Sequence, residues 1–347
     1  MFRDITLRDL MALHAKEPHT MVDVRSPKEF KEASIPGALN IPVFNDEERA
    51  EVGTIYKQVG QAEAKKRGLE IFAAKLPAFI AEFEAIDTSL TVFCWRGGMR
   101  SKTAATVLDL MGIHPHRLTG GIRTYRQWVV EELANYEYPP ELIVLNGYTG
   151  SGKTVILHKL AEAGEPIVDL EHLAGHRGSI FGQIGLEANN QKNFESLLLH
   201  DLKRTSDKPV VFIEGESKRI GKVTMPGFLF EKKEHSRQLI IQLPIEERVR
   251  ITLEDYQPAE RPEEFQAAFE QIRRRIHVPI AKEIEEALKT GDFDSATRLL
   301  LEHYYDPRYQ HSTGKVDDDL KITIAADTVD EAFEKVLAWK NEYMKLI

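Results

Sequence analysis

The chain is poor in cysteine and has no long apolar run. Cys94 is the only cysteine among its 347 residues, so no disulfide can form within the chain, which is typical of proteins in a reducing compartment. No apolar run approaches the ~18–20 residues of a membrane-spanning helix, and the first residues do not resemble a signal peptide. We therefore expect a cytoplasmic protein with no membrane partner. Cys-x-x-Cys and His-Glu-x-x-His spacings are also absent, which argues against a zinc site.

Positive charge is not in excess either. The formal net charge is −9, and residues 251–347 carry most of it, with 13 basic and 21 acidic side chains. An acidic chain is not the usual profile of a nucleic-acid-binding protein, although the local field at the contact face decides phosphate affinity. Three basic clusters fit either a solvated face or a nucleic-acid contact: Lys65-Lys66-Arg67, Lys218-Arg219 with Lys222, and Arg273-Arg274-Arg275.

Cys94 lies between two segments of different character. The apolar, β-prone run Leu90–Phe93 precedes it, and a helix-like stretch from Lys102 to Met111 follows the glycine-rich loop. Backbone N–H groups converge at such a turn and the helix N-terminus adds positive potential, so the position suits anion chemistry and a reactive thiolate. A buried cysteine that acts as a small apolar residue fits the same pattern.

A second motif follows the apolar strand signal Leu142–Asn146. It has the form G-x4-G-K-T and precedes a helix-like stretch from Val155 to Ala163, and its residues are Gly147, Tyr148, Thr149, Gly150, Ser151, Gly152, Lys153 and Thr154. In this context the pattern predicts a phosphate loop, in which backbone N–H groups surround phosphate oxygens and the lysine adds a positive charge. The threonine hydroxyl is a candidate Mg²⁺ ligand. The motif indicates a di- or triphosphate and does not specify ATP.

The break Tyr136–Pro140 separates the two motif regions. We expect one domain over 1–136, with a helical insertion at about 46–83, and a second domain over 140–347. The second region alternates strands and helices, as a parallel sheet requires. Strands are expected at 142–146, 166–169, 210–214, 238–243 and 321–326, and a mostly helical extension at 246–310.

Two carboxylates end expected strands of the second domain. Asp169 ends the second strand and Glu214 the third. A carboxylate at such a strand tip commonly orients Mg²⁺ or its water beside a phosphate loop, or acts as a general base. A helix cap or a turn residue fits the same positions.

Four segments in order resemble the rhodanese domain: Met21–Phe30, Ile35–Pro42, the spacing Cys94-x5-Arg100 and Leu118–Tyr125. The resemblance covers about residues 5–135. It implies that Cys94 carries sulfur or selenium as a covalent adduct. Arg96 and Arg100 would then neutralise the incoming anion.

The whole chain, from about residue 5 to 340, resembles the bacterial tRNA 2-selenouridine synthase family. Further segments that carry this resemblance are Asp169–Ser179, Glu214–Gly221 and His303–Tyr309, whereas Tyr148 stands where the family pattern has glycine. The resemblance implies an α/β fold: an N-terminal rhodanese-like domain, then a P-loop NTPase-like parallel-sheet domain with a helical C-terminal extension.

The same resemblance implies a two-step modification of the wobble 2-thiouridine of tRNA. Geranyl diphosphate first S-geranylates the base, and selenium from selenophosphate then replaces the geranylthio group, with Cys94 attacking selenophosphate and holding the selenium. The implied partners are tRNA and an enzyme that supplies selenophosphate. No tightly bound cofactor is implied, and Mg²⁺ is a candidate ion. The basic clusters at Lys65–Arg67 and Lys218–Lys222 are candidate tRNA contacts. A geranyl groove or a core position fits Phe181, Phe194, Leu197 and Leu198.

Two other functions fit the same motifs. An ATP-dependent rhodanese-type sulfurtransferase acting on another substrate would keep Cys94 and the phosphate loop but would lack a geranyl groove. A chalcogen carrier without catalytic activity or a nucleotide-gated binding module is the other alternative, but binding alone does not require a cysteine flanked by arginines. Mass analysis of tRNA nucleosides with and without the gene separates these alternatives.

Overall fold

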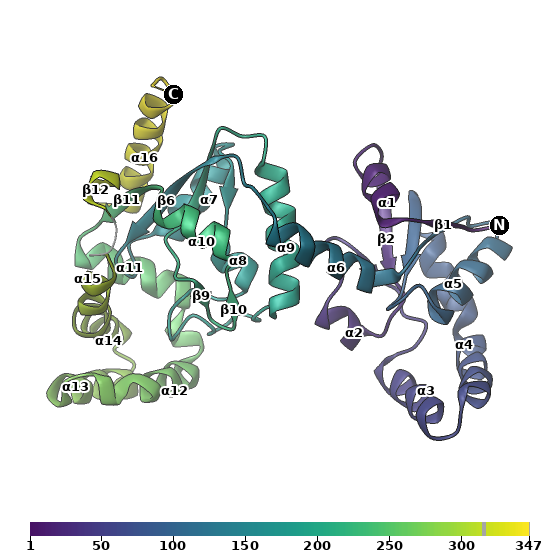
Figure 1. The fold of residues 1–347 in the computed structure, drawn as a ribbon. Helices are drawn as coiled ribbons and strands as arrows, with labels where there is room; N and C mark the ends of the chain where they lie inside the picture. The colour runs from purple at the N-terminus through teal and green to yellow at the C-terminus, as the bar shows by residue number, and fades with distance from the viewer. Residues whose placement is uncertain (314–316, 347) are drawn as a thin grey trace. The chain divides into compact units, whose positions relative to one another are not determined.

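The computed structural model describes residues 1–313 and 317–346 and divides into two compact units (Figure 1). The first comprises Met1–Asn135 with Glu195–Leu197, and the second comprises Tyr136–Phe194 with Leu198–Ile347. Cys94 lies in the first unit and the G-x4-G-K-T motif lies in the second. Among the described residues, no helix is both long and apolar enough to cross a membrane.

The first unit is built on a five-stranded parallel sheet with the order β1-β5-β4-β2-β3. Its strands are β1 (Arg3–Ile5), β2 (His19–Asp23), β3 (Leu39–Asn40), β4 (Ser89–Phe93) and β5 (His116–Leu118). The connecting helices are α1 (Leu7–His14), α2 (Pro27–Glu32), α5 (Met99–Leu110) and α6 (Gly121–Ala134). The central strands are buried on both faces, as the fully buried Val22 and Val92 show. This arrangement is the expected rhodanese-like fold.

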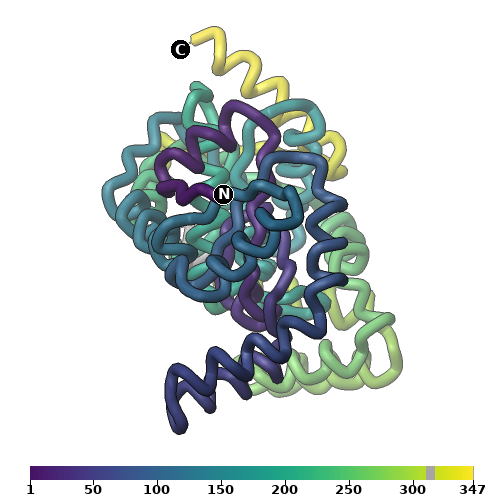
Figure 2. The backbone as a smooth tube through the Cα atoms, turned by 90° about the vertical axis from the view of Figure 1, so that its right-hand side faces the viewer, coloured from purple at the N-terminus to yellow at the C-terminus, as the bar shows by residue number. Residues whose placement is uncertain are grey.

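Two helices, α3 (Asp46–Gln58) and α4 (Gln61–Glu84), connect β3 to β4. They run side by side away from the sheet (Figure 2). Ion pairs join them, with Arg67 Nε 2.6 Å from a Glu51 oxygen and Lys75 paired with Glu48. The C-terminal half of α4 packs on the sheet through a cluster of buried phenylalanines, Phe72, Phe79 and Phe83. The pair therefore extends the sheet's core at one end and forms a separate surface at the other.

The second unit has a five-stranded parallel sheet with the order β12-β11-β6-β8-β7. Its strands are β6 (Glu141–Gly147), β7 (Ile167–Val168), β8 (Val210–Glu214), β11 (Arg237–Gln242) and β12 (Lys321–Ala325). These five match the expected strands to within one residue at each end. The sheet helices are α7 (Lys153–Glu162), α8 (Leu170–Ala174), α9 (Gln191–Thr205), α10 (Gly227–Glu234) and α16 (Val329–Tyr343). A small antiparallel hairpin, β9 (Arg219–Ile220) and β10 (Val223–Thr224), was not expected from the sequence.

The helical extension lies between β11 and β12. It comprises α11 (Ile245–Tyr256), η1 (Pro258–Glu260), α12 (Pro262–Ile272), η2 (Arg273–Arg275), α13 (Val278–Thr290), α14 (Phe293–Leu300), the π-helical turn η3 (Leu301–Tyr305), α15 (Asp306–Thr313) and η4 (Asp318–Leu320). The extension has its own apolar cluster, in which Phe265, Phe269 and Ile284 are buried. The chain then returns to the sheet as the edge strand β12. The parallel sheet with its helical extension confirms the expected fold class.

Candidate active sites

Cys94 directly follows β4, and the loop that it begins leads into α5. Two glycines allow the close packing of this loop. Gly97 has a φ of +65°, and a Cβ at Gly121 would lie 2.1 Å from the Cys94 carbonyl oxygen. The Ile122 N–H donates to that same carbonyl at 2.9 Å. The Cys94 side chain is buried, and its Sγ lies 3.1 Å from the Ser101 hydroxyl. The thiol is therefore held in one position at the N-terminal end of a helix.

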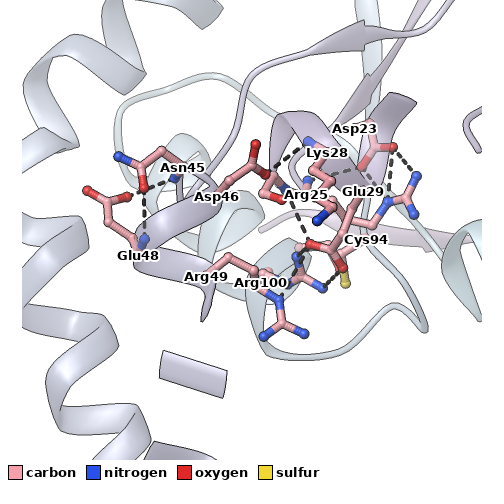
Figure 3. Close-up of polar contacts among 12 residues, drawn as sticks. Asp23, Arg25, Lys28, Glu29, Asn45, Asp46, Glu48, Arg49, Cys94 and Arg100 are labelled. Carbon is pink, nitrogen blue, oxygen red and sulfur yellow. Dashed lines mark hydrogen bonds and ion pairs between the residues drawn. The ribbon is translucent and has the colours of Figure 1, made fainter. Parts of the chain in front are cut away.

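The cations around Cys94 differ in how they are engaged. The Arg96 side chain is exposed. Arg100 forms a two-point ion pair with Glu29, as Figure 3 shows beside Cys94. Burial alone would raise the pKa of Glu29, but Arg100 and Arg49 together lower it. The charge of Arg100 is therefore largely balanced within the protein.

Arg117 is a third cation near the thiol that the sequence did not indicate. It donates to the Gly97 carbonyl at 3.2 Å and forms an ion pair with Asp4. Its pKa is raised, mainly by the hydrogen bond to Asp4 and by the charge of that carboxylate. Because β5 pairs with β4, this strand places a guanidinium beside the cysteine loop.

A fully buried ion pair supports the strand next to β4. Arg25 donates to both Asp23 carboxylate oxygens, at 3.0 and 2.6 Å, and Ser34 donates to the same carboxylate. The Arg25 guanidinium lies 5.9 Å from the centre of the Trp95 ring, in the cysteine loop. The Asp-Val-Arg segment of the sequence is therefore a structural brace that contacts the loop.

In the second unit, the phosphate loop connects β6 to α7. A Cβ at Gly147, Gly150 or Gly152 would lie 2.5–2.6 Å from neighbouring side-chain atoms, and all three have positive φ. Lys153 Nζ donates to the Gly147 carbonyl at 3.2 Å, and the Thr154 hydroxyl donates to Glu171 at 3.0 Å. The buried Ser151 hydroxyl has no hydrogen-bond partner. Apart from the buried Ser151, these residues line a cavity of 570 Å³, within the range of about 300–1,000 Å³ that is common for small-ligand sites.

Residues from the helical extension fix the outer side of the phosphate loop. Arg248 donates twice to the Thr149 carbonyl, at 3.0 and 2.9 Å, and forms a two-point ion pair with Asp306 of α15. Tyr148 packs against Tyr309, with ring centroids 4.6 Å apart. The tyrosine that replaces the expected glycine at position 148 therefore makes an aromatic contact with the helical extension.

The two carboxylates expected at strand ends take different positions. Asp169 caps α8 by accepting from the His172 N–H at 2.8 Å, and it pairs with His158 at 2.6 Å. Glu214 is completely buried; one oxygen accepts from the Glu171 N–H and the other has no partner. Asp169 thus makes a helix cap, which was the alternative to a Mg²⁺ or general-base role in the sequence analysis.

Two further glutamates, Glu171 and Glu216, complete a cluster of acidic groups beside the phosphate loop. Burial first, and then repulsion by Asp169 and Glu171, raises the pKa of Glu214 well above its usual range. Burial and the charge of Glu216 raise the pKa of Glu171 to about 8, against the opposing effect of Lys153. Both glutamates lie two residues after the carboxylates noted from the sequence, and that spacing is the signal that could have revealed them.

The basic clusters lie on different surfaces. Lys65, Lys66 and Arg67 are on α4, where Arg67 is paired with Glu51 and Glu70. Lys218, Arg219 and Lys222 are exposed on and beside the β9–β10 hairpin, with no carboxylate partner in the described chain. A Cβ at Gly221 would lie 2.5 Å from His176, so the hairpin turn is packed closely on the unit.

The residues considered for a geranyl groove are mostly core residues. Phe194 and Leu198 of α9 are completely buried, and Phe181 belongs to the apolar cluster of the helical extension. Leu197 is half-buried. Of the two positions considered, a place in the hydrophobic core rather than in a geranyl groove therefore describes Phe181, Phe194 and Leu198.

Comparisons with known proteins match both units. The family model for the tRNA 2-selenouridine synthase AAA domain matches residues 140–340, and that for the rhodanese-like domain matches residues 6–127. The tRNA 2-selenouridine synthase of Sulfurovum sp. is 32% identical over 324 residues, which cover 84% of this chain and 88% of that protein. The tRNA 2-selenouridine synthase of Hydrogenovibrio crunogenus is 35% identical over 326 residues, which cover 85% of this chain and 89% of that protein. This chain therefore belongs to the tRNA 2-selenouridine synthases, a family of tRNA-modifying transferases.

Proposed function

We propose that this protein makes 2-selenouridine from the wobble 2-thiouridine of tRNA in two steps, S-geranylation and then replacement of the geranylthio group by selenium. The observation that carries the proposal is that one chain holds both a cavity lined by a phosphate loop with its Lys153 and Thr154 and a buried, cation-flanked thiol at a strand–helix turn. A thiocarbonyl sulfur is a poor leaving group until it is alkylated, so the first step prepares the second.

The phosphate-loop unit would catalyse the geranylation. The uridine sulfur attacks the first carbon of geranyl diphosphate, the carbon–oxygen bond breaks, and diphosphate leaves with the negative charge. Loop N–H groups and Lys153, whose Nζ lies at the loop, would stabilise that charge as it develops, so no nucleotide hydrolysis would be needed.

Mg²⁺ fits this site by the chemistry of its donors. The Glu214 oxygen without a partner and the Thr154 hydroxyl are hard oxygen ligands beside the phosphate loop. Within residues 1–313 and 317–346, no three His, Cys, Asp or Glu side chains could hold a metal ion by themselves. Mg²⁺ usually takes only one or two carboxylates, with substrate phosphates and water completing its shell. When bound, it would supply charge neutralisation of the diphosphate.

The cysteine unit would catalyse selenation. The bond between C2 of the base and the geranylated sulfur breaks, a bond between C2 and selenium forms, and geranylthiol leaves. Selenium enters at the selenide level and the phosphorus of selenophosphate ends as phosphate with an oxygen from water, so the reaction needs no oxidant or reductant. We assign to Cys94 the attack on the phosphorus of selenophosphate: the sulfur–phosphorus bond forms as the phosphorus–selenium bond breaks, and the released selenide attacks C2 of the base. Water then hydrolyses the sulfur–phosphorus bond, which frees the thiol and gives phosphate, and Arg96 and Arg117 would attract the selenophosphate anion.

The β9–β10 hairpin and the cations of α4 would bind the tRNA backbone. Lys218, Arg219 and Lys222 have no carboxylate partner in the described chain, so their charge is free to meet phosphates despite the acidic composition. Lys65 and Lys66 are exposed in the same way on the other unit. A base in its stack is inaccessible to alkylation, so the wobble uridine must be turned out from its neighbours.

The test is nucleoside mass analysis of a 2-thiouridine-containing tRNA after incubation with the purified protein. With geranyl diphosphate alone we expect S-geranyl-2-thiouridine, and with selenophosphate added we expect 2-selenouridine. Absence of the geranylated nucleoside together with formation of 2-selenouridine would contradict the two-step scheme. A sulfurtransferase that requires ATP would give neither product under these conditions.

A further inference from the structure

An apolar cavity of 390 Å³ lies in the first unit between the helical insertion and α5. Helix α5 begins directly at the cysteine loop, and its residues Met99, Arg100 and Thr103 form one wall. The other walls come from the segment before α3 and from α3 and α4, and most of their residues are apolar, among them Phe44, Val52, Tyr56, Leu69 and Phe72. No step described so far uses this cavity.

The cavity opens to solvent through large apolar side chains. Tyr56 is 57% exposed, Leu69 is 65% exposed and Met99 is 56% exposed, although α3 and α4 are otherwise rich in charged residues. Apolar side chains that gather around a hollow, unlike single ones scattered over a surface, indicate a ligand-binding groove. The volume lies within the range of about 300–1,000 Å³ that is common for small-ligand sites.

Cations line the same cavity. Arg49, Lys65 and Arg100 are among its lining residues. Glu29 is the carboxylate partner of both arginines: it makes a two-point hydrogen-bonded pair with Arg100, whereas its oxygen is 3.5 Å from Arg49 Nε. That buried Nε has no hydrogen-bond partner, and Figure 3 shows Arg49 beside the Glu29–Arg100 pair. One carboxylate thus serves two guanidiniums, which leaves net positive charge beside the apolar walls.

We propose that this cavity binds the isoprenoid chain of S-geranylated uridine in tRNA while the thiol site replaces the geranylthio group. An apolar interior with a cationic border fits a hydrocarbon chain carried on a polyanion, and the position beside the cysteine loop fits a chain whose attached sulfur must leave near Cys94. The inference rests on the proposed function and assigns to that reaction a pocket for its leaving group. Geranylation at the phosphate loop does not require this cavity.

The experiment compares two substrates in the selenation step alone. A tRNA that carries S-geranyl-2-thiouridine and one that carries S-methyl-2-thiouridine are each incubated with selenophosphate and the full-length protein, and kcat/KM for 2-selenouridine formation is measured by mass analysis. The test variant is Leu69→Glu, which puts a charge on the cavity wall. The control variant is Val59→Glu, because Val59 is 68% exposed on the same insertion but does not line the cavity.

We expect the wild-type protein to prefer the geranyl substrate by about tenfold or more, which corresponds to ~1.4 kcal/mol. Leu69→Glu should lose this preference while it keeps its rate on the methyl substrate and its rate of geranylation. Val59→Glu should keep the preference. An unchanged preference in Leu69→Glu, or equal rates on both substrates in the wild type, would overturn the inference and leave the two-step function standing. If the wild type selenates neither substrate, the proposed function fails first, and the inference fails with it.

Discussion

Ser101 lies within hydrogen-bonding distance of the Cys94 sulfur, so the thiol is positioned by its own helix as well as by the loop. Cys94 and Lys153 were predictable from the sequence because each belongs to a motif whose spacing has a physical purpose. The contacts that fix the two loops were not predictable. Glu29 is 71 residues from Arg100, and Arg248 is 99 residues from Thr149. Only the fold brings such pairs together.

Substitution of the nucleophile should separate the two chemical steps. Cys94→Ser preserves shape but replaces the thiol with a hydroxyl that does not ionise near neutral pH, so selenation should stop while geranylation continues. Nucleoside mass analysis measures both products in one sample. Ser101→Ala is the matched control, because it removes the neighbouring hydroxyl and keeps the sulfur; it should retain selenation. Formation of 2-selenouridine by Cys94→Ser at the wild-type level would contradict the role given to Cys94.

The buried Glu214 predicts a pH dependence of stability. Its pKa is raised in the folded protein by burial and by Asp169 and Glu171, so the folded state keeps a proton that the unfolded state loses above a pH of about 4.3. Stability must then fall as pH rises from that value toward the raised pKa, by up to about 1.4 kcal/mol per pH unit for each retained proton. The stabilisation is fully present below the unfolded pKa.

Glu214→Gln removes this titration and keeps an acceptor for the Glu171 N–H. Without Mg²⁺, the Tm of the variant should therefore rise relative to that of the wild type as pH increases from 5 to 8. Scanning calorimetry at several pH values measures the difference, and Glu162→Gln, at an exposed position of the same unit, serves as the control. A Tm difference that stays constant over this range would show that Glu214 does not hold a proton in the folded protein.

At the scale of elements, the predictable parts are those with strong periodic or apolar patterns. The strands β6, β7 and β8 of the second unit are mostly apolar runs, β11 and β12 are rich in isoleucine, and each of the five was placed to within one residue at each end. The β9–β10 hairpin has two residues in each strand and no pattern, so the sequence gives no sign of it. Its fold depends on the packing of Gly221 against His176, which is a tertiary contact.

That hairpin supports a prediction on tRNA binding. Reversing Lys218 and Arg219 to glutamate should weaken tRNA affinity, because each single-strand phosphate contact contributes about −0.7 to the slope of log affinity against log salt. Affinity for geranyl diphosphate should not change. Titrations at two salt concentrations measure both quantities. Reversal of the exposed Arg274 and Arg275 is the control for a general effect of charge, and equal weakening by the two variants would mean that the hairpin is not a specific contact.

At the scale of the whole molecule, the sequence indicated the rhodanese-like and P-loop folds because each region has motifs in the order that its fold requires. It did not indicate the acidic cluster around Glu214, the brace from Arg248 to Asp306, or the apolar cavity beside α5. These features depend on side chains from several elements and appear only when the sheets are assembled. The division into two units, with one motif in each, is the basis for assigning one chemical step to each unit.

The central claim is that the two steps are separate, and Lys153→Ala tests it most directly. Loss of this charge from the phosphate loop should slow geranylation by ~10²–10³-fold, since removal of one such contact costs ~2.7–4 kcal/mol. The variant should nevertheless convert tRNA that already carries S-geranyl-2-thiouridine to 2-selenouridine at the wild-type rate. Both rates are measured by nucleoside mass analysis. An unchanged geranylation rate, or failure to selenate the pre-geranylated tRNA, would contradict the account.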